Sequence, residues 1–403
     1  MAQHPFLKSI RPINLLSFGP NTEDIELRPL NILIGPNGGG KSNLIEILGL
    51  LSKLPDKDPW KFVTQAGGVD EWIWKGVLKP NTATAVPPSI QIAYQPADTT
   101  APHNYKIEFT KNQSTYSFDV RSENIWVDVP QDHRRVAYVN RPSDSPDSAF
   151  IYVGTSEMSK AKALNIKLSL LAQLVDPFNY QELFYLGQKL AKTVLYCDWV
   201  FGRGSEIREP QPVGFDSYRL AGDSINLAQV LKAWRDRGDQ AVFDRLIELM
   251  RTFYEPVKDV DTELLGTHLR LMVKEDGLSS RTPATRLSDG TLRWLMLLII
   301  LLDPAPPPVI CIDEPELGLH PDILPTLADL LRDASTRTQL ILTTHSRTLV
   351  ECFSDDPESV CVCEKFDGAT EIKRLEADRM KVWLDKYSLG QLWSSGEIGG
   401  NRW

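Results

Sequence analysis

A glycine-rich stretch near the N-terminus has the residue types and spacing of a phosphate-binding loop. It reads Gly35-Pro36-Asn37-Gly38-Gly39-Gly40-Lys41-Ser42, matches G-x-x-x-x-G-K-[ST], and directly follows an apolar run. Glycines let such a loop curl so that backbone N–H groups point at phosphate oxygens, helped by the N-terminus of the next helix. We expect Lys41 to reach the β- and γ-phosphates and the Ser42 hydroxyl to bind Mg²⁺. The alternative is a glycine-rich turn that only opens a helix. The expected nucleotide-binding residues are Asn37, Gly38, Gly39, Gly40, Lys41, Ser42 and Asn43.

A pair of carboxylates follows a buried-strand pattern far downstream. Four apolar residues, Val309 to Ile312, precede Asp313 and Glu314. Ligands of α/β sheets bind at the carboxyl ends of strands, and a nucleotide site needs a second metal ligand and a residue that positions water. We therefore expect Asp313 to hold Mg²⁺ through its hydration shell and Glu314 to polarise the attacking water. Without the loop upstream, this pair would read equally well as a helix start.

Two further polar segments accompany these residues. The apolar run that begins at Gln339 ends in Thr343-Thr344-His345-Ser346, which places His345 at a strand end. A lone histidine there is more often a hydrogen-bonded structural residue. The segment RLSDGT opens an apolar helix, so the Ser288 hydroxyl, the Gly290 N–H and the helix dipole form a second anion site. Taken alone, that segment is a capped helix start.

The surrounding pattern predicts the elements that position these residues. Strands are expected at Ile10–Ser17, Asp24–Leu27 and Leu30–Ile34, followed by a helix that stops near Pro55. Short β-rich runs between residues 90 and 153 indicate an antiparallel sheet, and residues 160 to 257 show helical spacing. From His268 onward strands such as HLRLMV, VICI and QLILTT alternate with helices, as in a covered parallel sheet. We expect an α/β fold with a β-rich lobe at 1–160, an inserted helical subdomain at 161–257 and a parallel-sheet lobe at 258–403.

Length and composition indicate a globular chain without a membrane span. Of 403 residues, 42% are apolar and 24% charged, which excludes a disordered or low-complexity chain. The longest apolar run, Trp294 to Leu302, falls well short of the roughly 20 residues of a membrane helix. No secretory signal is visible and five cysteines make no disulfide framework, so we expect a cytoplasmic protein. The net charge of −9 argues against a globally basic nucleic-acid coat but leaves a local positive groove open.

The ordered segments GPNGGGKS, RLSDGT, VICIDEPE, ELGLHPD and TTHS resemble the ABC-class ATPases, particularly the RecF, SMC and OLD-like clade of chromosome, repair and phage-defence ATPases. The likeness covers essentially the whole chain and implies a P-loop ABC-type ATPase head. In this family two heads sandwich two ATP molecules, each between one subunit's Walker A loop and the other's signature motif. ATP and Mg²⁺ are the implied ligands, and a homodimer or higher assembly is the implied state. The resemblance assigns Lys41 and Ser42 to Walker A, Ser288 and Gly290 to the signature, Asp313 and Glu314 to Walker B, Leu319, His320 and Asp322 to the D-loop region, and His345 as the switch histidine.

Some positions depart from the family pattern. The signature has Asp289 where a glycine is usual, which places a carboxylate near incoming phosphates. Lys41 and Ser288 are 247 residues apart, more than in transporter ATPases, yet SMC-type coiled-coil arms are missing. A Q-loop glutamine is not obvious; Gln173 is our metal-ligand candidate, and a polar helix residue is the alternative. Only 58 residues follow His345, too few for the nuclease domain of OLD-like enzymes, so a nuclease would be a separate polypeptide.

Three other residue groups have functional and structural interpretations. A basic set could line a groove for duplex DNA, although solvated surface charge is the commoner explanation; its members are Arg134, Arg135, Arg141, Lys160, Lys162 and Lys167. Cys361 and Cys363 share one face of an expected strand, and without a second pair they read as core rather than zinc ligands. An aromatic C-terminal segment is expected to dock on its own domain rather than on a partner; it contains Trp383, Tyr387, Leu389, Leu392, Trp393 and Trp403.

These patterns together predict an ATP-binding and ATP-hydrolysing head, with Glu314, His345 and Lys41 as its catalytic residues. Its nucleotide-dependent dimerisation would drive or gate a DNA-repair or phage-defence complex with a separate effector, and double-stranded DNA is a further candidate partner. The chemistry is in-line attack of water on the γ-phosphate. A nucleotide-gated scaffold with negligible turnover is the alternative, and Asp289 favours it. The long Walker A to signature spacing disfavours a transporter motor.

Overall fold

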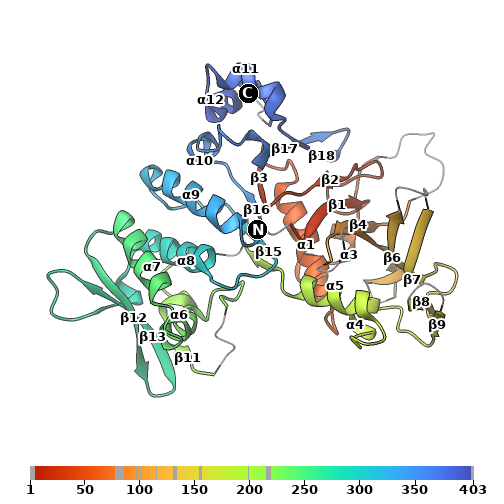
Figure 1. Ribbon diagram of the computed structural model, residues 1–403, viewed down its shortest axis with the longest axis horizontal. Coiled ribbons are helices and arrows are strands. Elements are labelled where there is room, and N and C mark those ends of the chain that lie inside the picture. Colours follow the sequence, from red (N-terminus) through yellow and green to blue (C-terminus); the bar gives the residue numbers. More distant parts are fainter. Residues whose placement is uncertain are drawn as a thin grey trace.

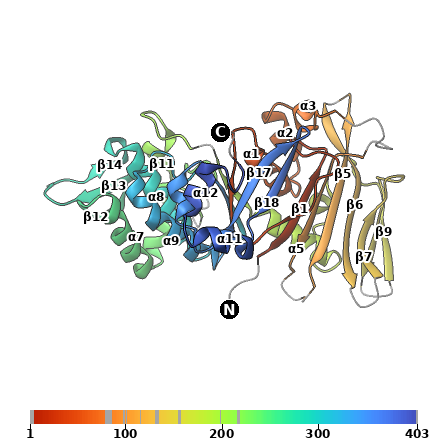
Figure 2. The same ribbon diagram turned by 90° about the horizontal axis from the view of Figure 1, so that it is seen from above.

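The computed structural model describes residues 5–77, 86–96, 99, 101–114, 116–129, 134–153, 157–197, 199–214 and 219–400. A central sheet separates an antiparallel lobe from a second lobe of helices and a long hairpin (Figure 1). Seen from above, the two lobes lie at opposite ends of the molecule with the central sheet between them (Figure 2). Among the described residues, no helix is both long and apolar enough to cross a bilayer.

The central sheet has six strands in the order β10-β15-β16-β3-β17-β18, and all neighbours except β17 and β18 pair in parallel. Its core strands read as short apolar runs because both of their faces are buried. The expected strands Leu30–Ile34, VICI and QLILTT are therefore confirmed. The bounds are β3 Leu30–Ile34, β10 Val194–Tyr196, β15 Val309–Asp313, β16 Gln339–Thr343, β17 Val360–Phe366 and β18 Ala369–Arg374.

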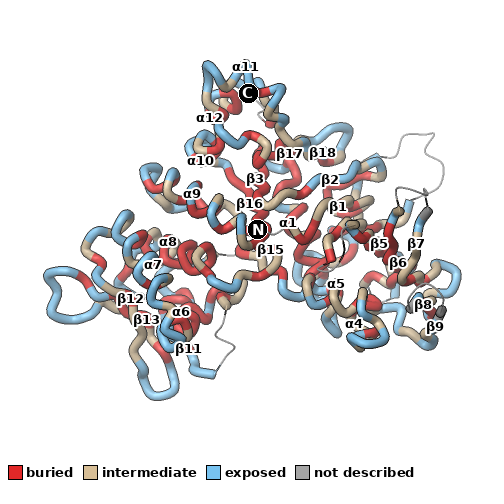
Figure 3. Tube along the Cα trace, in the orientation of Figure 1, coloured by how far each residue is buried: buried red, intermediate tan, exposed pale blue. Residues whose placement is uncertain are grey.

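Helices cover both faces of this sheet, which separates two hydrophobic cores. Ile32 and Ile34 face one core, whereas Leu33, between them, faces the other. Helix α8 is apolar around its whole circumference because it lies between α7 and α9. In Figure 3 the central strands β3, β15 and β16 are coloured mostly as buried residues. The first core contains α8 Asp289–Leu302, α9 Leu324–Ser335, α10 Arg347–Glu351, α11 Ala377–Leu384 and α12 Leu389–Ser395, and the second contains α1 Lys41–Lys53.

An eight-stranded antiparallel sheet forms the lobe next to α1, as expected from the β-rich runs. The β-rich segments SFDV and NIWVDV both belong to one long strand, β6. Strand β1 ends before Ser17 because Asn14 and Leu16 adopt positive φ angles. The strands are β1 Leu7–Ile13, β2 Ile25–Glu26, β4 Ser89–Tyr94, β5 His103–Asn112, β6 Ser117–Val129, β7 Arg134–Arg141, β8 Ala149–Val153 and β9 Glu157–Ala161; the helices are α2 Trp60–Gln65, α3 Val69–Trp72, α4 Leu170–Gln173 and α5 Gln181–Ala191.

The remaining lobe corrects two expectations. The run HLRLMV lies in β13, which pairs antiparallel with β12 in a separate small sheet and not in the parallel sheet. The segment expected to be helical also contains β10, which joins the central sheet beside β15. The division at residues 160 and 257 stays a prediction. The lobe contains α6 Leu227–Asp236, α7 Gln240–Phe253, β11 Gln211–Pro212, β12 Val257–Leu265, β13 His268–Glu275, β14 Thr282–Pro283 and the 3₁₀ turns η1 Glu206–Arg208 and η2 Ala284–Arg286.

Candidate nucleotide site

The glycine-rich loop connects the end of β3 to the start of α1 and packs against the β17–β18 hairpin. Gly40 has φ 99°, and a Cβ there would lie 2.8 Å from Ser17 Oγ and would overlap the Thr370 side chain. A Cβ at Gly39 would lie 2.9 Å from the Cys363 carbonyl oxygen. The Thr370 hydroxyl is 3.0 Å from Gly39 O. Glycines are required here because the loop lies directly on this hairpin.

Lys41 is the first residue of α1, directly after the glycine-rich loop. Its ammonium donates to the carbonyls of Gly35, at 2.8 Å, and Pro36, at 3.2 Å. Burial lowers the pKa of Lys41, and the charges of Cys363, Glu314 and Asp313 oppose that shift. The carboxylates of Glu314 and Asp313 therefore interact electrostatically with the Lys41 ammonium. The first turn of α1 carries no acidic residue that would repel an anion.

The two Walker B carboxylates emerge where β15 ends. Asp313 stands opposite Thr343 of β16, whose hydroxyl donates to the Asp313 carboxylate. The next residue, Glu314, has φ 46°, a left-handed conformation that is unfavourable for a residue with a side chain. Its N–H donates to Thr343 O at 3.2 Å and to Thr343 Oγ1 at 3.1 Å. Strain of this kind persists where surrounding structure holds it, and it often marks functional sites.

His345 lies against Glu314, with Nε2 3.5 Å from Glu314 Oε1. Glu316 holds the end of β16, because its buried carboxylate accepts from Thr344 Oγ1 at 2.6 Å and from the His345 N–H at 3.0 Å. Burial lowers the pKa of His345 and Lys41 adds to that effect, whereas Glu314 and Asp313 oppose it. The imidazole is therefore neutral at pH 7, with a nitrogen available to accept or donate a hydrogen bond.

The signature segment forms the N-terminus of α8. Ser288 is the N-cap residue, and its hydroxyl accepts from the Thr291 N–H at 3.1 Å. A Cβ at Gly290 would lie 3.0 Å from Gly318 O, so the signature packs against the turn after Walker B. Further along this turn, Leu319 is half-buried, and His320 and Asp322 are exposed and lie 3.2 Å apart.

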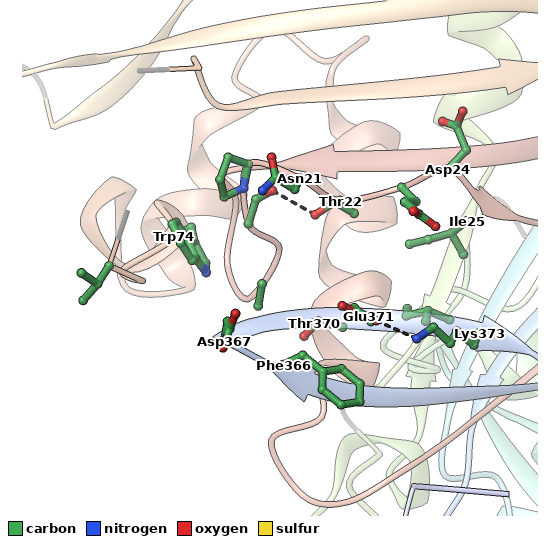
Figure 4. Close-up of a pocket in the computed structure, with 16 residues that line it drawn as sticks. Asn21, Thr22, Asp24, Ile25, Trp74, Phe366, Asp367, Thr370, Glu371 and Lys373 are labelled. Carbon is green, nitrogen blue, oxygen red and sulfur yellow. Dashed lines mark hydrogen bonds and ion pairs between the residues drawn. The ribbon is translucent and has the colours of Figure 1, made fainter. Parts of the chain in front are cut away.

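A cavity of about 350 Å³ has Thr370 in its lining, and its described lining contains none of residues 35–42. It lies between the turn at residues 19–25 and the β17–β18 hairpin (Figure 4). Trp74 and Phe366 contribute aromatic surfaces to its lining, and Glu371 pairs with Lys373 at 2.8 Å.

The structure thus brings Lys41, Asp313, Glu314 and His345 to one edge of the central sheet, because β3, β16 and β15 are adjacent and parallel. Ser42 is exposed at the same edge and Asn43 is half-buried. A serine hydroxyl and a carboxylate are oxygen ligands of the kind that Mg²⁺ prefers. Ser42 and Asp313 would therefore hold the ion.

Gln173 is not brought to this site, which corrects its choice as a metal ligand. Its amide Nε2 donates to the carbonyls of Asn165 and Leu168, both at 3.0 Å, and its Oε1 accepts from the Asn165 N–H at 2.8 Å. The residue therefore closes a local loop before α4. Strand β10 pairs with β15, so the segment after β10 leaves the sheet beside Asp313 instead.

Sequence reasoning missed four residues around the site. Thr343 and Glu316 had a local signal, because each is a polar residue that directly adjoins a recognised motif. Arg293 had none: it donates to Glu314 O at 3.2 Å and stacks over the Trp199 and Phe201 rings. Arg208, which contacts Asp289 from 81 residues away, had none either.

The proposed DNA groove is only partly compatible with the structure. Arg141 is fully buried and donates to the carbonyls of Pro146, Asn165 and Leu168, so its assignment to a groove is wrong. Arg135 is exposed but pairs with Asp128 at 3.2 Å. The Arg134 side chain lies outside the described residues, and the exposed members that remain are Lys160, Lys162 and Lys167.

The cysteine pair and three of the six named C-terminal residues belong to the core. Cys361 and Cys363 are buried on β17, and the described residues contain no group of three or more His, Cys, Asp or Glu side chains that could hold a metal ion. Leu389, Leu392 and Trp393 are buried, whereas Trp383 and Tyr387 are about half exposed; Trp403 lies outside the described residues.

Fold and site together define a P-loop ATPase head of the ABC type. The chain belongs to the family described as "AAA domain, putative AbiEii toxin, Type IV TA system", which it matches over residues 30–351. No curated protein matches the sequence at a significant level.

Solved structures of Smc heads share the fold. The chain is similar to an Smc head bound to the C-winged helix domain of ScpA, with TM-score 0.56 and 15% identity over 94% of this chain and 100% of that one. It is also similar to Smc heads with coiled coils from Pyrococcus furiosus, at TM-score 0.50, 14% identity and coverage of 95% and 99%, and from Pyrococcus yayanosii, at TM-score 0.50, 12% identity and the same coverage. The expected ABC-type head is therefore confirmed as the fold.

Proposed function

We propose that this protein binds ATP with Mg²⁺ and hydrolyses it at the edge formed by β3, β15 and β16. The observation that carries the proposal is the contact of Glu314 with His345 beside Lys41 and Asp313. A carboxylate next to a neutral imidazole and a lysine at a glycine loop is a set that can position water and stabilise a triphosphate.

Each residue has a distinct task in this proposal. The loop N–H groups and Lys41 bind the β- and γ-phosphates. Glu314 accepts a hydrogen bond from the attacking water and holds it in line with the γ-phosphorus. His345, kept neutral by burial and by Lys41, orients that water or the γ-phosphate. Bound Mg²⁺ would neutralise charge on the triphosphate, with Ser42 and Asp313 as its ligands.

A second copy of the chain completes the site. The signature residues Ser288 and Gly290 form an anion site at the N-terminus of α8 that a triphosphate on a facing copy can satisfy. Exposure of the turn that carries His320 and Asp322 supports a facing copy there. ATP then favours the closed dimer, and hydrolysis removes the shared γ-phosphate and favours separation.

The dimerisation cycle gates a separate partner protein, in a defence or DNA-repair role. Two observations support this: the family description names a toxin–antitoxin system, and two of the similar Smc heads are bound to a domain of ScpA. A nuclease is our candidate effector. Lys160, Lys162 and Lys167 are the exposed cations that support duplex DNA as a further partner.

The test compares steady-state ATP turnover and ATP-dependent association of the wild type, Lys41→Ala and Glu314→Gln. We expect Lys41→Ala to lose ATP affinity. Glu314→Gln is expected to bind ATP, lose turnover by about 100-fold or more, and accumulate as the ATP-bound dimer. Glu248→Gln changes an exposed carboxylate on α7 and serves as the matched control. Wild-type turnover in both site variants would reject the proposal.

A nucleotide-gated scaffold is the second candidate, and the carboxylate of Asp289 at the signature favours it. A negative charge at this anion site opposes binding of a triphosphate and weakens closure. Tight ATP binding by the wild type with turnover near the uncatalysed rate would select the scaffold over the enzyme.

A further inference from the structure

Arg208 is a buried cation whose hydrogen bonds to described residues go to two chain segments. It lies in η1, between β10 and β11, and its side chain is 5% exposed. The guanidinium Nε donates to Phe201 O at 2.6 Å. Nη1 donates to Ala284 O at 2.8 Å and to Leu287 O at 2.7 Å, and Nη2 donates to the Asp289 carboxylate. The planar fork of arginine suits this geometry, and a lysine could not reproduce it.

Three of these four bonds end in the signature loop. Ala284 begins η2, Leu287 precedes the N-cap residue Ser288, and Asp289 is the first residue of α8. Arg208 therefore fixes both the path of the loop into the helix and the carboxylate beside the cap. Buried carbonyls at 284 and 287 would lose a charged donor if this guanidinium were removed.

The fourth bond connects the loop to Walker B through a short relay of contacts. Phe201, whose carbonyl accepts from Arg208, presents its ring to the guanidinium of Arg293 at 5.0 Å. Arg293 in turn donates to Glu314 O at 3.2 Å. Within one copy, the signature loop is thereby connected through Arg208, Phe201 and Arg293 to the backbone of Glu314.

The charge balance at the signature follows from the same contact. The Asp289 side chain is 65% exposed at the N-terminus of α8, where an anion is expected to bind. An unpaired carboxylate at this helix N-terminus would repel a triphosphate bound there. When the carboxylate is bonded to a buried guanidinium, the ion pair as a whole has no net charge.

We propose that Arg208 is a positioning residue for the signature: it neutralises Asp289, so that the α8 N-terminus accepts the triphosphate of a facing copy, and it holds Ser288 and Gly290 in place. The inference rests on the proposed function for its ATP-dependent part. It also makes the presence of Asp289 compatible with an active head.

The experiment is a double-mutant cycle in the full-length protein with Arg208→Met, Asp289→Asn and the pair combined. In the described part of the chain Arg208 bonds to Phe201 and to residues 284–289 and not to the 35–42 loop, so Arg208→Met is expected to bind fluorescent ATP within about twofold of the wild type. Association with a non-hydrolysable ATP analogue, followed by sedimentation, is expected to weaken by about tenfold or more. Adding Asp289→Asn should recover several-fold of that loss. If Asp289→Asn does not restore association in the double variant, the claim that Arg208 neutralises Asp289 is overturned. If Arg208→Met associates as strongly as the wild type, the proposed role of Arg208 is overturned as a whole.

A second measurement separates this inference from the proposed function. Amide exchange at residues 284–292 in nucleotide-free protein is expected to accelerate in Arg208→Met, while exchange at residues 41–53 is unchanged. If the methionine variant fails to fold, Arg208→Lys keeps the charge with a single donor group and should show a smaller acceleration and several-fold weaker association. Unchanged exchange in the variants overturns the positioning role. Absence of ATP-dependent association in the wild type, with exchange still altered, counts against the proposed function alone.

Discussion

Substitution of Gly40 by alanine is expected to destabilise the phosphate loop through a specific collision. The φ of 99° at this position is unfavourable for alanine, which costs about 1–2 kcal/mol. The added methyl group would also lie 2.7 Å from Thr370 Cγ2 and 2.8 Å from Ser17 Oγ, in a region where both side chains are buried. Overpacking of this kind costs about 1–3 kcal/mol. We expect a total loss of about 2–5 kcal/mol.

Gly38→Ala is the matched control. Its φ of 75° carries a similar backbone cost, but no atom lies within 4 Å of the added Cβ. The difference between the two variants, about 1–3 kcal/mol, isolates the collision. Urea unfolding followed by tryptophan fluorescence gives the stability change, and amide exchange across α1 locates it.

Thr370→Ala supplies the decisive comparison. Alone, it loses the contacts of the hydroxyl with Ser17 and Gly39 O and should cost about 1–2 kcal/mol. Combined with Gly40→Ala it removes the two colliding atoms of Thr370 and leaves only Ser17 Oγ close to the added Cβ, so the pair should be less destabilising than the sum of the single changes. Additive effects, or equal stability of Gly38→Ala and Gly40→Ala, would refute the reasoning.

Three more predictions concern charge and burial. His345 should titrate below its ordinary pKa of 6.5, and Glu314→Gln should lower that pKa further whereas Lys41→Ala should raise it. NMR of the imidazole measures these shifts. The stability that depends on neutral His345 is lost as the pH falls through the lowered pKa. Arg141→Ala should cost about 3–5 kcal/mol of unfolding free energy because it leaves the buried carboxylate of Glu123 without its cationic partner. Arg135→Ala removes only an exposed pair with Asp128 and should cost less than about 1 kcal/mol. Native protein should react with a disulfide reagent only at its two partly exposed thiols, Cys197 and Cys352. Burial raises the pKa of Cys361 to about 11 and shields Cys311 and Cys363 as well.

Each of these has a clear contrary result. A His345 pKa at or above 6.5, or a shift of the wrong sign in either variant, contradicts the charge arrangement. Equal stability of the two arginine variants would show that Arg141 is not a buried partner. Rapid modification of three or more thiols in the folded protein would mean that β15 or β17 is accessible.

The central strands could be predicted because their signal is local. Leu30–Ile34 and the runs before Asp313 and His345 are short apolar segments bounded by turn residues, and a strand buried on both faces requires that composition. Strand HLRLMV was misplaced because periodicity does not identify a strand's partner. β13 pairs antiparallel with β12, with His268 opposite Leu265, and the residues of β13 alone do not specify that partner.

The site shows the same division between local and distant information. Walker B was readable because Asp313 and Glu314 follow their strand directly. The wrong choice of Gln173 had the opposite origin: the strand that pairs with β15 is β10, which has only three residues and therefore a weak local signal. Arg141 looked like a surface cation because nothing nearby in sequence shows that loop 165–168 folds over it.

The sequence by itself determined which groups are available: a glycine loop with Lys41, carboxylates and a histidine at strand ends, and a capped helix with Asp289 in its first turn. These follow from backbone conformation and burial patterns within a few residues, which local side chains control. Only the tertiary structure decided which of them meet. The contacts of Thr370 with the loop and of Arg208 with Asp289 join residues far apart in the chain, and such contacts exist only after separate elements have packed into one core.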